Sequence, residues 1–158
     1  PRWRAELEAA GASVPPDHDP LHRPGGAALC ALTAELAPAP GSPAYPDYLQ
    51  YLHYGESSLA AFVTPMVRTM FLAPEDQRNN YTMQALREMY AGRLKLLDGV
   101  LAERPYVAGD DFTAADISVG YGLSLGERLN LGDTFPGEVK EYWAMLQERP
   151  AYKRAAAV

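Results

Sequence analysis

The stretch YVAGDDFTAADI, residues 106–117, constrains the fold more than any other, because it marks where a buried helix begins. Thr113 and Asp116 have the spacing of a capping box, in which the N-cap hydroxyl accepts from the N3 amide and the N3 carboxylate accepts from the N-cap amide. Phe112 and Ile117 have the offset of a hydrophobic staple across that cap. We therefore interpret these acids as the start signal of a helix rather than as catalytic carboxylates.

The segment that follows the cap, TAADISVGYGLSLGERL, is apolar on nearly every side of a helix. Gly120 and Gly122 lie inside it, and glycines at such positions allow a neighbouring backbone to approach closely. We expect this helix to be buried on every side, at the centre of a helical bundle.

Three other segments of the C-terminal part have helical periodicity. Residues 47–72 form one long helix, which we expect to kink at Pro65 because proline removes a backbone hydrogen bond. Residues 79–103 carry a second apolar stripe, made of Leu86, Met89, Tyr90, Leu94, Leu97 and Leu101. A third stripe, between Pro136 and Pro150, consists of Val139, Tyr142, Trp143 and Leu146, and a frayed turn should end the chain.

The N-terminal part differs in character. Short helices are expected at 2–10 and 27–36, with a Pro-rich loop between them. The predicted organisation is an N-terminal segment at 1–37, a Pro-rich linker at 38–46 and a helical domain at 47–158. The fold class is mainly α, a helical bundle with a small N-terminal appendage.

Composition excludes several classes of function. A formal net charge of -6, with Lys and Arg scattered among acids, argues against a nucleic-acid surface. The only cysteine, Cys30, allows no internal disulfide and is interpreted as buried and inert, and no residue set supports a metal site. No apolar run could span a membrane, so we expect a cytoplasmic protein without a membrane partner.

Two motifs resemble one known family. YVAGDDFTAADISVGYGLSLGERLNL, followed by VKEYWAMLQERPAYKRA, is similar to the signature of the C-terminal helical domain of cytosolic glutathione S-transferases, and YLQYLHYGESSL resembles the first helix of that domain in bacterial members. The match covers about residues 45–155. The resemblance implies a glutathione S-transferase C-terminal-like bundle preceded by a remnant of a thioredoxin-like α/β domain.

The same resemblance implies where glutathione, the co-substrate, would bind. GGAALCALTAEL is similar to the helix that closes the thioredoxin-like domain, and Gly25 and Gly26 stand where the family has the Glu-Ser pair that holds the γ-glutamyl end. Two glycines keep the backbone amides, which favour an anion at a helix N-terminus. The family's thiol-activating residue has no counterpart before Trp3, so the catalytic residue is unknown.

The resemblance also implies a pocket for a small hydrophobic electrophile and a homodimer. The pocket residues that we predict are Tyr51, Tyr54, Ser58, Phe62, Met66 and Tyr121. The alternative for each is ordinary core or interface packing, because aromatic residues at helical spacing most often pack.

Two functions remain open at this level. The first is a glutathione transferase, an enzyme of detoxification that conjugates the glutathione thiolate to electrophiles if its N-terminal domain is complete in the native protein. The alternative is a non-catalytic helical module that uses the same domain for dimerisation or partner binding.

Overall fold

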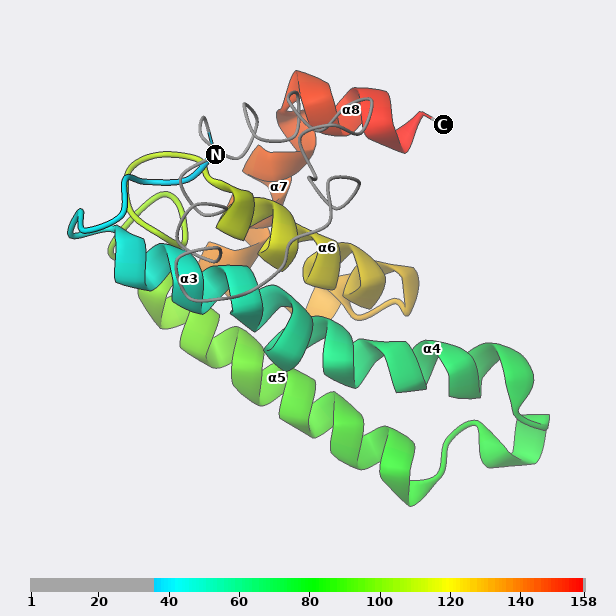
Figure 1. Ribbon diagram of the computed structural model, residues 1–158. Helices are drawn as coiled ribbons and strands as arrows, with labels where there is room; N and C mark the ends of the chain where they lie inside the picture. Colours follow the sequence, from blue (N-terminus) through cyan, green and yellow to red (C-terminus); the bar gives the residue numbers. More distant parts are fainter. Residues whose placement is uncertain (1–35, 158) are drawn as a thin grey trace, which may run out of the picture. The chain divides into compact units, whose positions relative to one another are not determined.

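The computed structural model of the chain describes residues 36–157, and the expectations for the helices at 2–10 and 27–36 and for Gly25, Gly26 and Cys30 fall outside that range. Within it the secondary structure is helical apart from a single bridge between Tyr106 and Gly109. The elements in chain order are α3 (Tyr45–Tyr54), the π-helical η3 (Gly55–Ala60), α4 (Ala61–Leu72), the short η4 (Glu75–Gln77), α5 (Tyr81–Leu101), α6 (Ala114–Arg128), the short η5 (Gly132–Thr134), α7 (Gly137–Glu148) and α8 (Pro150–Ala156). The predicted mainly α class is confirmed (Figure 1).

The start of α6 is where the sequence predicted it. Thr113 is the N-cap, and the Thr113 and Asp116 side chains form a capping box. The hydroxyl of Thr113 accepts from the Ala115 amide at 3.3 Å, and the Asp116 carboxylate accepts from the Thr113 amide at 2.8 Å. Val119 and Leu123, further along the helix, have no exposed surface. The cap therefore opens a helix whose inner face belongs to the core.

The expectation that α6 is buried on every side is wrong. Ile117 is 52% exposed and Tyr121, one turn later, is 55% exposed. The hydrophobic staple is also absent, because the ring of Phe112 packs edge-on against Tyr106 at 5.8 Å and lies 3.4 Å from the guanidinium carbon of Arg149. Those two contacts hold Phe112 and leave Ile117 facing outward.

Asp116 is the centre of a buried hydrogen-bond cluster. It has no exposed surface, and its carboxylate accepts from the Val107 amide at 3.0 Å and from the Thr113 hydroxyl at 3.1 Å in addition to the Thr113 amide. The hydroxyl of Tyr142 in α7 donates to it at 2.9 Å. Burial raises the pKa of Tyr142 well above its usual range, and the neighbouring Asp116 raises it further. One carboxylate thus joins the loop before α6, the cap of α6 and helix α7.

Helices α5 and α7 pack through the stripes expected for them, with one exception. The four predicted core residues of α7 are buried, as are Tyr90, Leu94, Leu97 and Leu101 of α5, whereas Met89 is 48% exposed. Met89 therefore lies on the outward side of α5, although its neighbour Tyr90 is buried. Met83, which was not predicted, is buried instead.

The sequence did not predict two features of the C-terminal part: the cap at the start of α7 and the last helix, α8. Asp98, on α5, accepts from the amides of Glu138 at 3.0 Å and Val139 at 3.3 Å, and so caps the N-terminus of α7 from another helix. The residues after Pro150 form the helix α8 rather than the frayed turn that we expected, and Tyr152 on this helix packs edge-on against Trp143 at 5.4 Å.

Replacing Asp116 with Ala should lower the free energy of unfolding by about 3 kcal/mol, because two amides and two hydroxyls would lose their acceptor in the core. Urea denaturation followed by far-UV circular dichroism measures the change. Asp111→Ala removes an exposed carboxylate from the same loop and should leave the midpoint almost unchanged. Equal effects of the two substitutions would contradict the assigned role of Asp116.

Candidate functional site

Five of the six predicted pocket residues lie on the continuous helical run formed by α3, η3 and α4, and Tyr121 lies on α6. Figure 1 shows this run crossing over α6 on one side and lying alongside α5 on the other. Side chains of the run therefore face either α5, α6 or the outside of the described helices. Which of these directions each predicted residue takes decides what it can contribute to a site.

The run changes its hydrogen-bond pattern at η3. The Ala61 amide donates to the Glu56 carbonyl five residues back, which is π-helical geometry, a rare form found often at functional sites. At its entrance the Leu52 carbonyl accepts from the Ser118 hydroxyl of α6 at 2.7 Å. Pro65, where we predicted a kink, is an interior residue of α4, and the π-helical segment lies before it.

Glycines make the contact between η3 and α6 possible. A Cβ atom on Gly55 would lie 2.3 Å from the carbonyl carbon of Ser118, and one on Gly122 would lie 2.6 Å from Cβ of Leu59. Both distances are too short for any side chain, so these two positions require glycine. The close approach expected for Gly122 is confirmed, whereas no sequence pattern had pointed to Gly55 or to Ser118.

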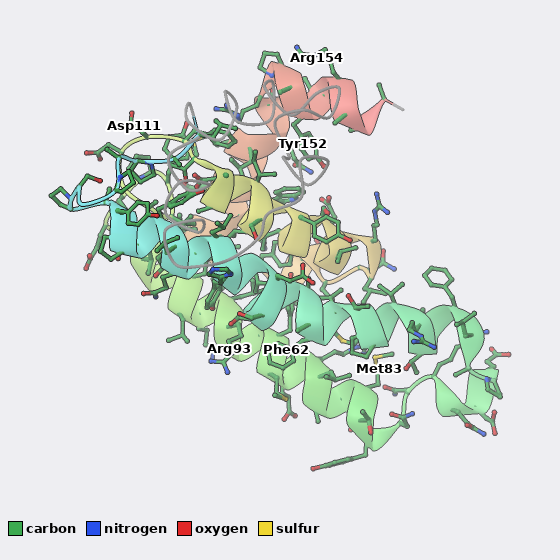
Figure 2. All side chains as sticks on the ribbon, viewed as in Figure 1. Phe62, Met83, Arg93, Asp111, Tyr152 and Arg154 are labelled. Atoms are coloured by element: carbon green, nitrogen blue, oxygen red, sulfur yellow. The ribbon has the colours of Figure 1, made fainter. Side chains whose placement is uncertain are left out.

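Tyr54 and Phe62 face α5. The Tyr54 hydroxyl donates to the backbone carbonyl of Arg93 at 2.8 Å, and the guanidinium carbon of Arg93 lies 5.9 Å from the centre of the Phe62 ring. Figure 2 shows Phe62 and Arg93 close together on these two helices. Burial raises the pKa of Tyr54 to about 12, with the positive charge of Arg93 opposing part of the rise. Its hydroxyl is thus a neutral donor already bound within the bundle.

Tyr51 and Met66 belong to the core. Tyr51 is 6% exposed and packs against the Tyr54 ring at 5.7 Å, while Met66 has no exposed surface. The guanidinium of Arg104 lies over the Tyr51 ring at 5.6 Å and pairs with the carboxylate of Asp47. Tyr51 and Met66 therefore hold the helical run against the core.

Ser58 and Tyr121 have open surface. Ser58 is partly exposed with its hydroxyl 3.5 Å from that of Ser57, which itself donates to the His53 carbonyl at 2.8 Å. Tyr121 lies on the outward side of α6 beside Ile117. The structure thus separates the six residues into a pair in the core, a pair facing α5 and a pair with access from outside. Their role in binding stays a prediction.

Two cavities lie at other places in the described part of the chain, and sequence reasoning missed both. The first, of about 290 Å³, is lined by Leu101, Arg104, Pro105, Glu138, Glu141, Tyr142 and Met145. The second, of about 340 Å³, is lined by Glu127, Asn130, Gly132, Asp133, Phe135, Lys140, Trp143, Ala144 and Gln147. Neither contains a predicted pocket residue. The orphan donors nearest to them, Nε of Arg104 and Nε1 of Trp143, have no accessible surface through which a ligand could reach them.

Among residues 36–157, no group of three or more His, Cys, Asp or Glu side chains is arranged to hold a metal ion. None of the helices in this range combines the length and the apolar character needed to cross a membrane.

Comparison with known proteins identifies similar chains. No protein-family model matches this one. Glutathione S-transferase 2 of Saccharomyces cerevisiae is 43% identical over 58 residues, which are 36% of this chain and 25% of the yeast protein. The crystal structure of Gtt2 from Saccharomyces cerevisiae matches with a TM-score of 0.61 and 28% identity, over 75% of this chain and 59% of that one.

A sphingomonad glutathione S-transferase in complex with glutathione matches with a TM-score of 0.62 and 27% identity. That match covers 77% of this chain and 57% of the sphingomonad chain. The present chain therefore spans little more than half the length of the solved structures that it resembles.

Tyr54 should titrate far above an ordinary tyrosine. Because its folded-state pKa is raised from 10.0 to about 12, its contribution to stability is complete below pH 10 and is lost as the pH rises towards 12. Difference titration of tyrosinate absorbance between the native protein and Tyr54→Phe should show one group ionising near pH 12. If Tyr54→Phe instead removed a tyrosine that ionises near pH 10, the raised pKa of Tyr54 would be contradicted.

Proposed function

We propose that this chain carries the helical domain of a glutathione transferase and acts as a transferase that joins the glutathione thiol to small apolar electrophiles. The observation that carries this proposal is the likeness of its helical bundle, at a TM-score of 0.62 and 27% identity, to a glutathione S-transferase in complex with glutathione. Because the chain spans 57% of that relative, both the binding of glutathione and the conjugation are proposed for it.

The proposed reaction needs little acid or base chemistry from the helical domain. The thiolate sulfur of glutathione attacks an electrophilic carbon, a carbon–sulfur bond forms, and the leaving group departs with its electron pair while the thiol proton passes to solvent. What the helical domain supplies is an apolar surface that orients the electrophile next to the thiolate. No described residue is assigned to lowering the pKa of the thiol.

Within the helical domain, the candidates for that surface are the predicted residues with open area. Tyr121 is 55% exposed on α6, and Ser58 and Phe62 are partly exposed on the run from α3 to α4. Tyr51 and Met66 support this run from the core, and the hydroxyl of Tyr54 is committed to Arg93. We therefore assign electrophile contact to Tyr121 and Ser58, because Phe62 packs against Arg93 of α5, and we assign glutathione contact to the backbone amides of Gly25 and Gly26.

Retention on immobilised glutathione tests the binding step. We expect the full chain to bind glutathione-agarose and to elute with free glutathione, and to form the glutathione conjugate of chlorodinitrobenzene, measured by absorbance. Circular dichroism of the same sample shows whether the helices are folded. Passage of a folded protein straight through the column, without conjugation, would contradict the proposal and favour a non-catalytic helical module.

Substitution of Tyr121 separates the electrophile surface from the glutathione site. Tyr121→Ala should raise the KM for chlorodinitrobenzene about threefold to tenfold, because one large apolar contact is lost, and should leave the KM for glutathione nearly unchanged. Phe71→Ala, at an exposed aromatic on α4, is the matched control and should change neither value. If both variants behave alike, Tyr121 does not contact the electrophile.

A further inference from the structure

The helical run from α3 to α4 buries one residue in every four as it passes through η3. Tyr51, Gly55, Leu59 and Val63 are all buried. In an α-helix each step of four residues overshoots a full turn by about 40°, so three such steps would carry the buried side about 120° around the axis. The π-helical turn holds one residue more than an α-helical turn, which rotates the rest of the run back by about 100°. The π-helical turn thus keeps one side of the run buried throughout.

The hydroxyl of Ser118 in α6 bonds to the run where the π-helical turn begins. It donates to the Leu52 carbonyl at 2.7 Å, and the Ser57 hydroxyl donates to the next carbonyl, that of His53, at 2.8 Å. Hydroxyl groups that enter the backbone hydrogen-bond ladder of a helix favour a departure from α-helical geometry at that point. Because Ser118 belongs to another helix, its bond ties the register of the run to the position of α6.

Close packing fixes the same register at two points. A Cβ atom on Gly55 would collide with the Ser118 hydroxyl, so this hydroxyl reaches the Leu52 carbonyl only because residue 55 has no side chain. One turn later, a Cβ atom on Gly122 would lie 2.6 Å from Cβ of Leu59. The two contacts are four residues apart on both helices, which is the spacing of neighbouring turns in packed helices.

The two residues assigned to electrophile contact flank this crossing. Ser58 precedes Leu59 in η3 and Tyr121 precedes Gly122 in α6, so each is the chain neighbour of one member of the close contact. Ser58 is partly exposed and Tyr121 is 55% exposed. A change in the register of η3 would rotate Ser58 about the axis of the run and leave Tyr121 in place. The direction of the Ser58 side chain relative to α6 therefore depends on the π-helical turn.

We propose that Ser118 is a positioning residue for the electrophile surface. Its bond to the Leu52 carbonyl holds η3 in π-helical geometry, and that geometry sets the direction of the Ser58 side chain. The effect on the electrophile rests on the proposed conjugation reaction, whereas the hold on η3 does not. Because Ser118 acts through Ser58, its loss should affect the electrophile and not glutathione.

Hydrogen exchange of the full chain tests the hold on η3 without any measurement of activity. In Ser118→Ala the amides of residues 55–61 should exchange about fivefold faster than in the native chain, because opening of the turn no longer breaks the bond to α6. Ser118→Thr keeps the hydroxyl and should exchange like the native chain. Thr69→Val is the matched control, because the Thr69 hydroxyl donates to another carbonyl of the run, that of Pro65, at 2.9 Å. Native exchange in Ser118→Ala would overturn the proposal.

Steady-state kinetics test the positioning role in the same variants. Ser118→Ala should raise the KM for chlorodinitrobenzene about threefold to tenfold and leave the KM for glutathione nearly unchanged, and Ser118→Thr should restore the native value. A loss of stability alone would lower the amount of active enzyme and leave both KM values unchanged. If the KM for chlorodinitrobenzene stays native in Ser118→Ala, Ser118 supports only the fold and the positioning role is wrong.

The two measurements separate failure of the positioning role from failure of the proposed function. A native chain that forms no conjugate would refute the proposed function and the positioning role with it, while hydrogen exchange still decides whether Ser118 holds η3. A native chain that forms the conjugate, with Ser118→Ala and Thr69→Val alike in exchange and in both KM values, would refute the role of Ser118 alone.

Discussion

The buried carboxylate of Asp116 is the interaction on which the described bundle depends. Four donors from three parts of the chain converge on it: the Val107 amide, the Thr113 amide and hydroxyl, and the Tyr142 hydroxyl. A charge with no exposed surface is tolerated only when its hydrogen bonds are satisfied. Here the same bonds set the start of α6, the path of the loop before it and the position of α7. Asp116 lies in an acidic cluster of the sequence, and in the fold its carboxylate is a structural hydrogen-bond acceptor.

The second constraint is the close crossing of α6 with the run from α3 to α4. Gly55 and Gly122 remove the Cβ atoms that would collide with Ser118 and Leu59, and the Ser118 hydroxyl binds the Leu52 carbonyl where the π-helical segment begins. This crossing packs α6, which carries Tyr121 on its outward side, against η3, which carries the partly exposed Ser58. The proposed electrophile surface therefore rests on two glycines and one serine that do no chemistry themselves.

Different levels of the structure were predictable to different degrees. The capping box, the apolar stripe of α7 and most of that of α5 follow from local spacing, and the structure confirms them. The hydrophobic staple is absent because Phe112 packs instead against Tyr106 in the loop before the cap and against Arg149, which is distant in the sequence. Of the predicted pocket residues, Tyr51, Tyr54, Ser58, Phe62 and Met66 lie on the run from α3 to α4, where the sequence predicted a single long helix. That prediction could not distinguish the side that faces α5 from the side that faces outward, because helical periodicity describes one helix and not its neighbours.

By itself the sequence determined that this chain has a helical domain, where its central helix begins and which family that domain resembles. All three depend on interactions between residues a few positions apart, namely caps, stripes and turns, and these can be read from spacing alone. Only the tertiary structure decided that Ile117 and Tyr121 face outward, that Gly55 and Ser118 meet, and that α5 leaves Met89 and Leu96 uncovered. The reason is physical: whether an apolar side chain is buried depends on which other helix lies against it, and that contact joins residues distant in the chain.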